Sequence, residues 1–153
     1  MSVYSVDKLI SEARRLAKEY RMATGKTLPI SGEIAINDAI RLLGMQAAEA
    51  GTQGFDATYD YRGKKLRVQI KGRAVFNEKK GGHKLGQLKL EQEWDAIILV
   101  IMDDEYESRE LYLARREDIE EYSRNSNSRR GSLSLARFKI IGELVWDRDA
   151  IDD

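Results

Sequence analysis

Seven consecutive apolar residues, from 96 to 102, constrain the fold of this chain more than any other feature of its sequence. The run has the length of a β-strand and falls far short of the roughly 20 apolar residues needed to cross a bilayer. A strand that is apolar at every position is buried on both faces, which places it inside a sheet. Residues 110–114 (Glu-Leu-Tyr-Leu-Ala) predict a neighbouring strand.

Two helices are expected ahead of this sheet. Apolar residues recur at three- and four-residue intervals near the start of the chain, which predicts a helical segment over about residues 5–24 that ends before Gly25. After the break at Pro29, Ser31 is the expected N-cap of a second helix that runs to about residue 43. Glu33 lies at the edge of the apolar stripe of this second helix.

From residue 55 the apolar period changes to two, and this change predicts a β-hairpin. Apolar and polar residues alternate over 55–61 and again over 66–71. A two-residue loop at 62–63 and a four-residue loop at 61–64 give the same pairing, in which Asp56 lies opposite Gln69. Lys71 lies diagonal to Asp56 on the same face, within reach of a long side chain. A three-residue loop would break this pairing.

The remaining pattern completes an α/β domain. Residues 85–94 and 116–123 are expected to be helices, whereas residues 138–146 mix strand-like positions with a glycine and do not predict one element. We therefore expect one domain over residues 1–153, with a mixed β-sheet that helices cover on at least one face.

Composition limits the chemistry that such a domain can perform. The chain has no cysteine and a single histidine, His83, so thiolate zinc sites, cysteine nucleophiles and multi-histidine metal sites lack their residues. Carboxylates, amides and lysines remain. No export signal or membrane segment is visible, so a cytoplasmic location is expected.

The net charge of zero conceals large blocks of opposite sign. Residues 62–90 hold ten basic side chains against one acid, and residues 91–122 hold twelve acids against three arginines. The basic block contains Gln69 and Lys71. A concentration of cations of this kind favours a phosphate polymer as the partner. The alternative is that the two blocks pair with each other across the fold.

The segments Gly54-Phe55-Asp56-Ala57 and Val68-Gln69-Ile70-Lys71-Gly72, behind a helix that carries Glu33, resemble the PD-(D/E)xK nuclease superfamily. The resemblance spans about residues 31–102. It implies a restriction-endonuclease-like fold and a metal-dependent nuclease, most plausibly acting on DNA. It also implies that Asp56, Gln69 and Glu33 bind Mg²⁺ or Mn²⁺ and that these three residues act with Lys71 in catalysis. Phe55 stands where the family has proline, and Gln69 stands where it has a second acid.

Further basic and polar residues are expected to contact the phosphate backbone of the substrate. These substrate-binding candidates are Arg73, Lys79, Lys80, His83, Lys84, Gln87, Arg129 and Arg130. Two other functions stay open at this point: a nucleic-acid-binding module of the same fold with a silent site, and a protein-interaction domain. A homodimer would place two sites on the two strands of a duplex, so dimerisation is a further option.

Overall fold

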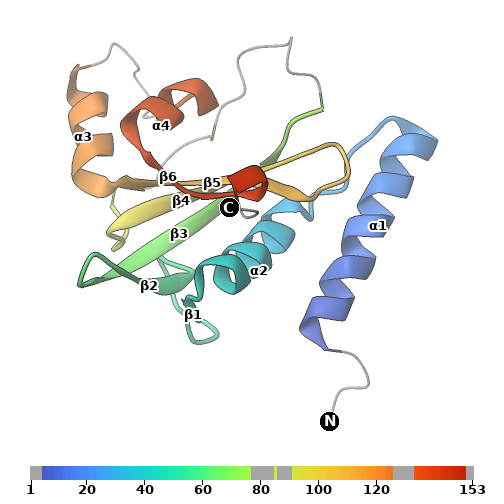
Figure 1. Cartoon of the computed structure of the whole chain (residues 1–153), viewed down its shortest axis with the longest axis horizontal. Coiled ribbons are helices and arrows are strands. Elements are labelled where there is room, and N and C mark those ends of the chain that lie inside the picture. The colour runs from blue at the N-terminus through green and yellow to red at the C-terminus, as the bar shows by residue number, and fades with distance from the viewer. Residues whose placement is uncertain (1–4, 77–84, 86–90, 126–132, 151–153) are drawn as a thin grey trace.

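The computed structural model describes residues 5–76, 85, 91–125 and 133–150 (Figure 1). It is an α/β structure with a mixed sheet flanked by helices, which confirms the predicted class and is compatible with a restriction-endonuclease-like fold. In chain order the elements are α1 (Val6–Thr24), α2 (Ser31–Leu43), β1 (Gln46–Ala47), β2 (Ala57–Tyr61), β3 (Lys64–Ala74), β4 (Ala96–Met102), β5 (Ser108–Arg115), α3 (Arg116–Asn125), α4 (Leu135–Ile141), β6 (Glu143–Asp147) and the 3-10 helix η1 (Arg148–Ala150).

The sheet has the strand order β1-β2-β3-β4-β5-β6, and only the β3–β4 pair is parallel. Every residue of β4 is buried, as its continuous apolar run predicts. One set of alternate β4 side chains packs in a cluster with residues of α2, and the other packs with residues of α3 and α4. Figure 1 shows these helices on opposite sides of the sheet. Both faces are therefore covered, because β4 presents apolar side chains to both.

The β2–β3 hairpin has the predicted register. Ala57 pairs with Val68 and Tyr61 with Lys64, so the loop consists of Arg62 and Gly63. Both loop residues have positive φ angles, 51° and 81°. This is the backbone geometry of the two-residue turns whose twist matches that of antiparallel strands, and glycine adopts it without strain.

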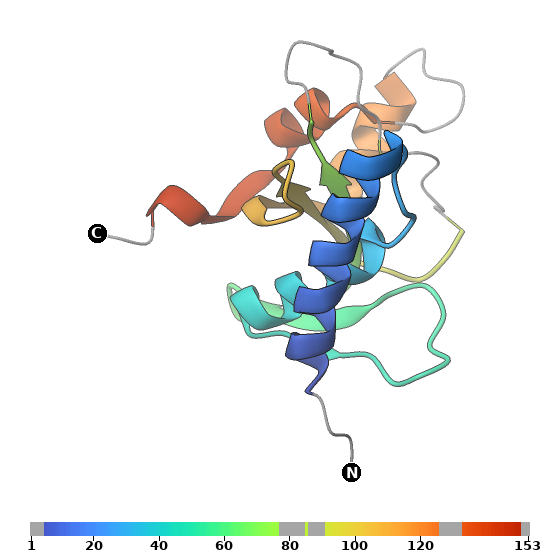
Figure 2. The same cartoon turned by 90° about the vertical axis from the view of Figure 1, so that its right-hand side faces the viewer.

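Helix α1 forms as predicted, but most of its apolar stripe does not face the core. Only Ala17 is buried, whereas Val6 and Leu16 are 64% and 55% exposed. The helix lies along the outside of the molecule, as Figure 2 shows. Its firmest attachment is polar: Arg14 Nη2 lies 2.8 and 2.7 Å from the two carboxylate oxygens of buried Asp38. None of the described helices is long and apolar enough to cross a membrane.

Two local expectations were wrong. Ile30, and not Ser31, is the N-cap of α2, because the Ile30 carbonyl already accepts a hydrogen bond from Ile34 N at 3.2 Å. The helix predicted at 85–94 is absent at its described residues, 85 and 91–94. Leu85 N instead donates to Leu133 O at 2.9 Å, and the Arg116 guanidinium binds the carbonyls of Gln92 and Trp94.

The C-terminal part resolves the ambiguous pattern at 138–146 into two elements. The end of α4 and all but the last residue of β6 lie in this stretch, with Gly142 between them. A Cβ atom at Gly142 would lie 2.9 Å from the carbonyl oxygen of Leu113, so the helix-to-strand junction touches β5 directly. Residues 116–123, predicted to be helical, lie within α3.

Candidate active site

Asp56, Gln69 and Lys71 line one cavity of about 240 Å³. Asp56 comes from the segment just before β2, and the other two residues come from β3. The hairpin register brings them together, as the alternation of side chains along the strands predicts. The complete lining is Thr52, Gly54, Phe55, Asp56, Gln69, Ile70, Lys71 and Gln92.

The Asp56 carboxylate is held against the backbone of β3. Its Oδ2 accepts a hydrogen bond from Ile70 N at 2.8 Å, and Asp56 N donates to Val68 O at 2.8 Å. These bonds extend the hairpin ladder by one residue and use a side-chain oxygen in place of a carbonyl. Oδ1 accepts no hydrogen bond from the part of the chain that the structure describes, so it remains an oxygen donor for a ligand.

The Gln69 side chain is held by its nitrogen. Nε2 donates to Gly54 O at 2.7 Å and lies 3.3 Å from Oε1 of Gln92. Gly54 has a φ of 97°, and a Cβ there would lie 2.9 Å from Glu93 O. Only glycine therefore fits at residue 54, and its carbonyl is placed firmly where it receives the Gln69 amide.

The position of Lys71 follows from the close packing of its neighbour. Gly72 lies directly against Ala35 of α2, and a Cβ at Gly72 would also lie 3.0 Å from Ser31 O. The absence of a side chain lets α2 approach one face of β3, so the alternation of the strand turns Lys71 to the other face. Lys71 pairs with Leu99 in the parallel β3–β4 register and is half-buried.

Glu33, the fourth predicted catalytic residue, does not lie with Asp56, Gln69 and Lys71 in the cavity lining. It is exposed in the first turn of α2. Helix α2 packs on the side of β3 where Val68 and Ile70 lie, whereas Gln69 and Lys71 lie on the other side. The participation of Glu33 in metal binding stays a prediction.

Of the predicted substrate-binding residues, the structure describes Arg73. Its guanidinium donates to Gly72 O and Leu85 O, both at 2.6 Å, so it ties residue 85 to β3. Burial lowers the pKa of Arg73 from its usual value. Its contact with a substrate stays a prediction. The other candidates, Lys79, Lys80, His83, Lys84, Gln87, Arg129 and Arg130, lie outside the described residues.

Sequence reasoning missed Gln92 and the Gly54 carbonyl as parts of this site. The pattern at 85–94 indicated a helix, which gave no reason to place residue 92 beside β3. Gly54 was visible as a neighbour of Asp56, but the role of its carbonyl depends on a backbone conformation with positive φ.

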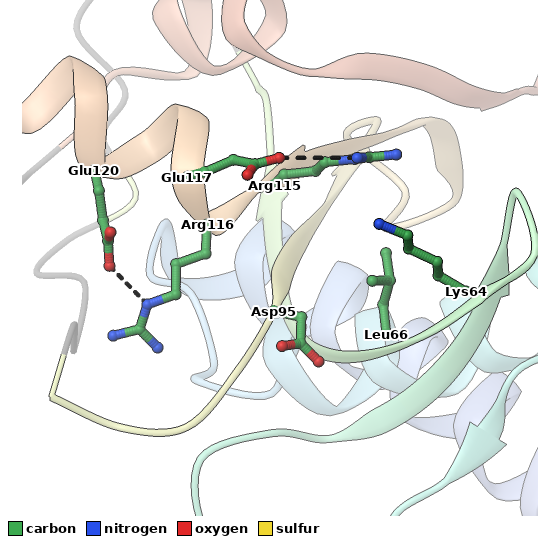
Figure 3. A pocket seen from close by; sticks show the side chains of 7 residues that line it. All are labelled: Lys64, Leu66, Asp95, Arg115, Arg116, Glu117 and Glu120. Carbon is green, nitrogen blue, oxygen red and sulfur yellow. Dashed lines mark hydrogen bonds and ion pairs between the residues drawn. The ribbon is translucent and has the colours of Figure 1, made fainter.

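A second cavity, of about 340 Å³, lies where β3, β4 and α3 begin and β5 ends, and Figure 3 shows its side chains. Its charges are mixed: the figure marks the pairs Arg116–Glu120 at 2.8 Å and Arg115–Glu117 at 3.8 Å. The lining consists of Lys64, Leu66, Asp95, Arg115, Arg116, Glu117 and Glu120. Because most of the ionic groups there already have partners of opposite charge, the cavity at Asp56 is the stronger candidate.

Arg67 forms ion pairs between the basic and acidic blocks of the sequence. Arg67 Nε lies 3.0 Å from Asp95 Oδ2, and Arg67 Nη1 lies 3.4 Å from Glu93 Oε2. The hydrogen bond from Arg67 lowers the pKa of Asp95. The two blocks thus pair in part, and Arg67 is engaged within the fold.

Neither a protein-family model nor a curated protein matches the sequence. Among the described residues, no group of three or more His, Asp or Glu side chains is placed to hold a metal ion. The cavity does contain the Asp56 carboxylate and the Gln69 amide, which are hard oxygen donors. Mg²⁺ commonly takes one or two carboxylates from a protein and completes its shell with water and substrate phosphate. The donor set therefore fits a weakly held Mg²⁺ or Mn²⁺ ion.

Proposed function

We propose that this protein is a metal-dependent nuclease that hydrolyses phosphodiester bonds, with DNA as its most plausible substrate. The observation that carries the proposal is the meeting of a carboxylate, an amide and a lysine in one cavity, formed by Asp56, Gln69 and Lys71. The composition supports the same proposal, because a chain with no cysteine and only one histidine must rely on carboxylates, amides and lysines for its chemistry. The resemblance of the segments around these residues to PD-(D/E)xK nucleases supports the same chemistry.

Each residue has a distinct task in the proposed reaction. Asp56 and Gln69 would supply oxygen ligands to Mg²⁺ or Mn²⁺. When bound, such an ion lowers the pKa of a coordinated water and offsets charge on the phosphate. Lys71 would orient the attacking water, donate a hydrogen bond to the phosphoryl oxygens, and stabilise their developing negative charge. The water oxygen would bond to phosphorus as the bond from phosphorus to the leaving sugar oxygen breaks; the water gives up a proton to solvent, and the leaving oxygen takes one up from solvent.

The substrate class rests on charge. Residues 62–90 carry a large excess of cations, and this segment supplies Gln69, Ile70 and Lys71 to the lining of the candidate cavity. Cations arranged along a surface bind a phosphate polymer by releasing its counterions, so the affinity should fall steeply with salt. A cytoplasmic location and a homodimer are parts of the same proposal, and a light-scattering mass equal to one chain would remove the dimer.

The proposal is tested by incubating labelled DNA and RNA with the protein and Mg²⁺ or Mn²⁺. Wild type should cleave DNA, and Lys71→Ala should abolish cleavage while circular dichroism and melting temperature stay unchanged. Lys65→Ala is the matched control, because Lys65 is exposed on the same strand and outside the cavity. Cleavage by Lys71→Ala at the wild-type rate would refute the assignment, and cleavage of RNA alone would correct the substrate.

A silent nucleic-acid-binding module is the second candidate. It is favoured by the neutral amide at residue 69, which leaves Asp56 as the single carboxylate among the described residues of the cavity lining. This function predicts salt-sensitive DNA binding that persists in a metal chelator, without cleavage under either metal. A protein-interaction domain, suggested by the Arg67–Asp95 contact between the two charge blocks, predicts no salt-sensitive DNA binding.

A further inference from the structure

The orientation of the Gln69 amide decides what it offers to a ligand. A primary amide can turn over and exchange its oxygen and nitrogen with almost no change in shape, so its hydrogen-bond partners determine the orientation. Here the NH₂ group faces two acceptors, Gly54 O at 2.7 Å and Gln92 Oε1 at 3.3 Å. Turning the amide over would place its oxygen against the Gly54 carbonyl and lose that hydrogen bond, and it would also lose the bond to Gln92 unless the Gln92 amide turned over with it.

The backbone of Gln92 is held in place by Arg116. The Arg116 guanidinium donates from Nη1 to Gln92 O at 2.6 Å and to Trp94 O at 3.1 Å. The same guanidinium lies 4.7 Å from the ring centroid of buried Trp94 and bonds to Glu120 at 2.8 Å. The backbone at residue 92 is therefore anchored to α3, although the segment around it is not helical.

We propose that Gln92 is a positioning residue, which orients the Gln69 amide so that the oxygen, and not the nitrogen, is presented to a divalent metal ion. This inference rests on the proposed function, since the metal is part of it. Gly54 O accepts one hydrogen of the NH₂ group, and Gln92 Oε1 is the acceptor nearest the other. With both hydrogens directed away, the amide oxygen is left for coordination. A ligand that is oriented in advance binds its metal more tightly than one that must be turned.

Mn²⁺ binding, followed by electron paramagnetic resonance without any substrate, tests the proposal in four proteins. They are wild type, Gln92→Leu, Gln69→Leu and the double variant. Loss of a residue that orients a ligand typically weakens metal binding by about tenfold, so Gln92→Leu should do the same. In the Gln69→Leu background, Gln92→Leu should change the Mn²⁺ affinity no further, because it acts through Gln69. An equal loss in both backgrounds, or no loss in either, would overturn the proposal.

A second readout needs no metal. The side-chain NH₂ of Gln69 gives two proton resonances in nitrogen-correlated NMR spectra. Gln92→Leu should shift one of them and leave the one bonded to Gly54 O in place. Unchanged resonances would overturn the inference, and Gln92→Ala checks the result if leucine perturbs packing.

Asp56→Asn separates this inference from the proposed function. It should reduce Mn²⁺ binding regardless of residue 92, because it removes the carboxylate of the site. If wild type binds no Mn²⁺, or if Asp56→Asn leaves the affinity unchanged, the metal site itself is refuted, and the role of Gln92 in it is refuted too. If Asp56→Asn weakens binding but Gln92→Leu does not, only the role of Gln92 is refuted.

Discussion

Replacing Gln69 by glutamate should destabilise this protein, although the change would restore the acid found at this place in PD-(D/E)xK nucleases. The two side chains have nearly the same shape, so the difference lies in the hydrogen bonds. Nε2 of Gln69 donates to Gly54 O at 2.7 Å, and a carboxylate oxygen in its place has no hydrogen to donate. Gly54 has little room to shift toward residue 93, because a Cβ atom on Gly54 would lie 2.9 Å from the carbonyl oxygen of Glu93.

The expected magnitude follows from that one contact. A neutral hydrogen bond contributes about 0.5–1.5 kcal/mol, and leaving its acceptor unpaired and partly buried costs about 1–3 kcal/mol. Because the site is half-exposed, we expect a loss of about 2 kcal/mol in the free energy of unfolding. For a domain of this size, that loss lowers the melting temperature by about 4–8 °C.

The assay is thermal unfolding of Gln69→Glu beside Gln46→Glu, which makes the same chemical change at an exposed residue of β1. The difference in melting temperature between the two variants should become smaller at acidic pH, where the protonated carboxyl of the new glutamate at residue 69 can donate a hydrogen bond to Gly54 O. Equal melting temperatures for the two variants at pH 7 would refute the reasoning, because the Gln69–Gly54 bond would then contribute nothing to stability.

Three other substitutions test the supports of the site and the fold. Gly54→Ala should lower the free energy of unfolding, measured in urea, by more than Gly51→Ala does. Both residues have positive φ, but of these two only a Cβ at Gly54 would meet backbone atoms. Arg14→Met should cost about 1.5–3 kcal/mol in the same assay, the range for hydrogen bonds to a charged group, because buried Asp38 loses Arg14 but keeps the Ser108 hydroxyl at 2.7 Å and Arg41 at 3.5 Å; an effect below about 1 kcal/mol, that of an exposed pair, would contradict this. Asp95→Asn should be less stable than wild type at pH 7, and the difference should shrink as pH falls below about 4. The reason is that Arg67 lowers the pKa of Asp95 in the folded state. The stability that the Arg67–Asp95 pair contributes is therefore present above the pKa that Asp95 has in the unfolded chain, and it is lost as the pH falls through the lower pKa of the folded state. A stability difference that does not depend on pH would contradict this prediction.

The central strands of this fold could be predicted because each is encoded by the order of apolar and polar residues within its own segment. The run at 96–102 has one stable place, inside a sheet covered on both faces. The alternation on either side of residues 62–63 determined the hairpin register, since a shift of one residue would exchange the buried and exposed faces. The expectation that Asp56, Gln69 and Lys71 share one face followed from that register.

The predictions from apolar spacing were incomplete or wrong where contacts with residues distant in the chain determine the local structure. Apolar spacing predicted α1 correctly, but spacing alone does not say which part of a stripe another element covers. Within the predicted helix at 85–94, the described residues 91–94 are not helical, and Arg116, more than twenty positions away in the chain, binds the carbonyls of Gln92 and Trp94.

The sequence by itself therefore determined the central strands of the sheet, the hairpin and the side-chain chemistry of the candidate site. Only the tertiary structure decided how that chemistry is oriented. The direction of the Gln69 amide depends on a glycine carbonyl with positive φ and on Gln92, whose backbone α3 holds in place. The physical reason is that periodicity encodes which face a residue occupies. The hydrogen-bond partners of a polar side chain depend on segments that come together only when the chain is folded.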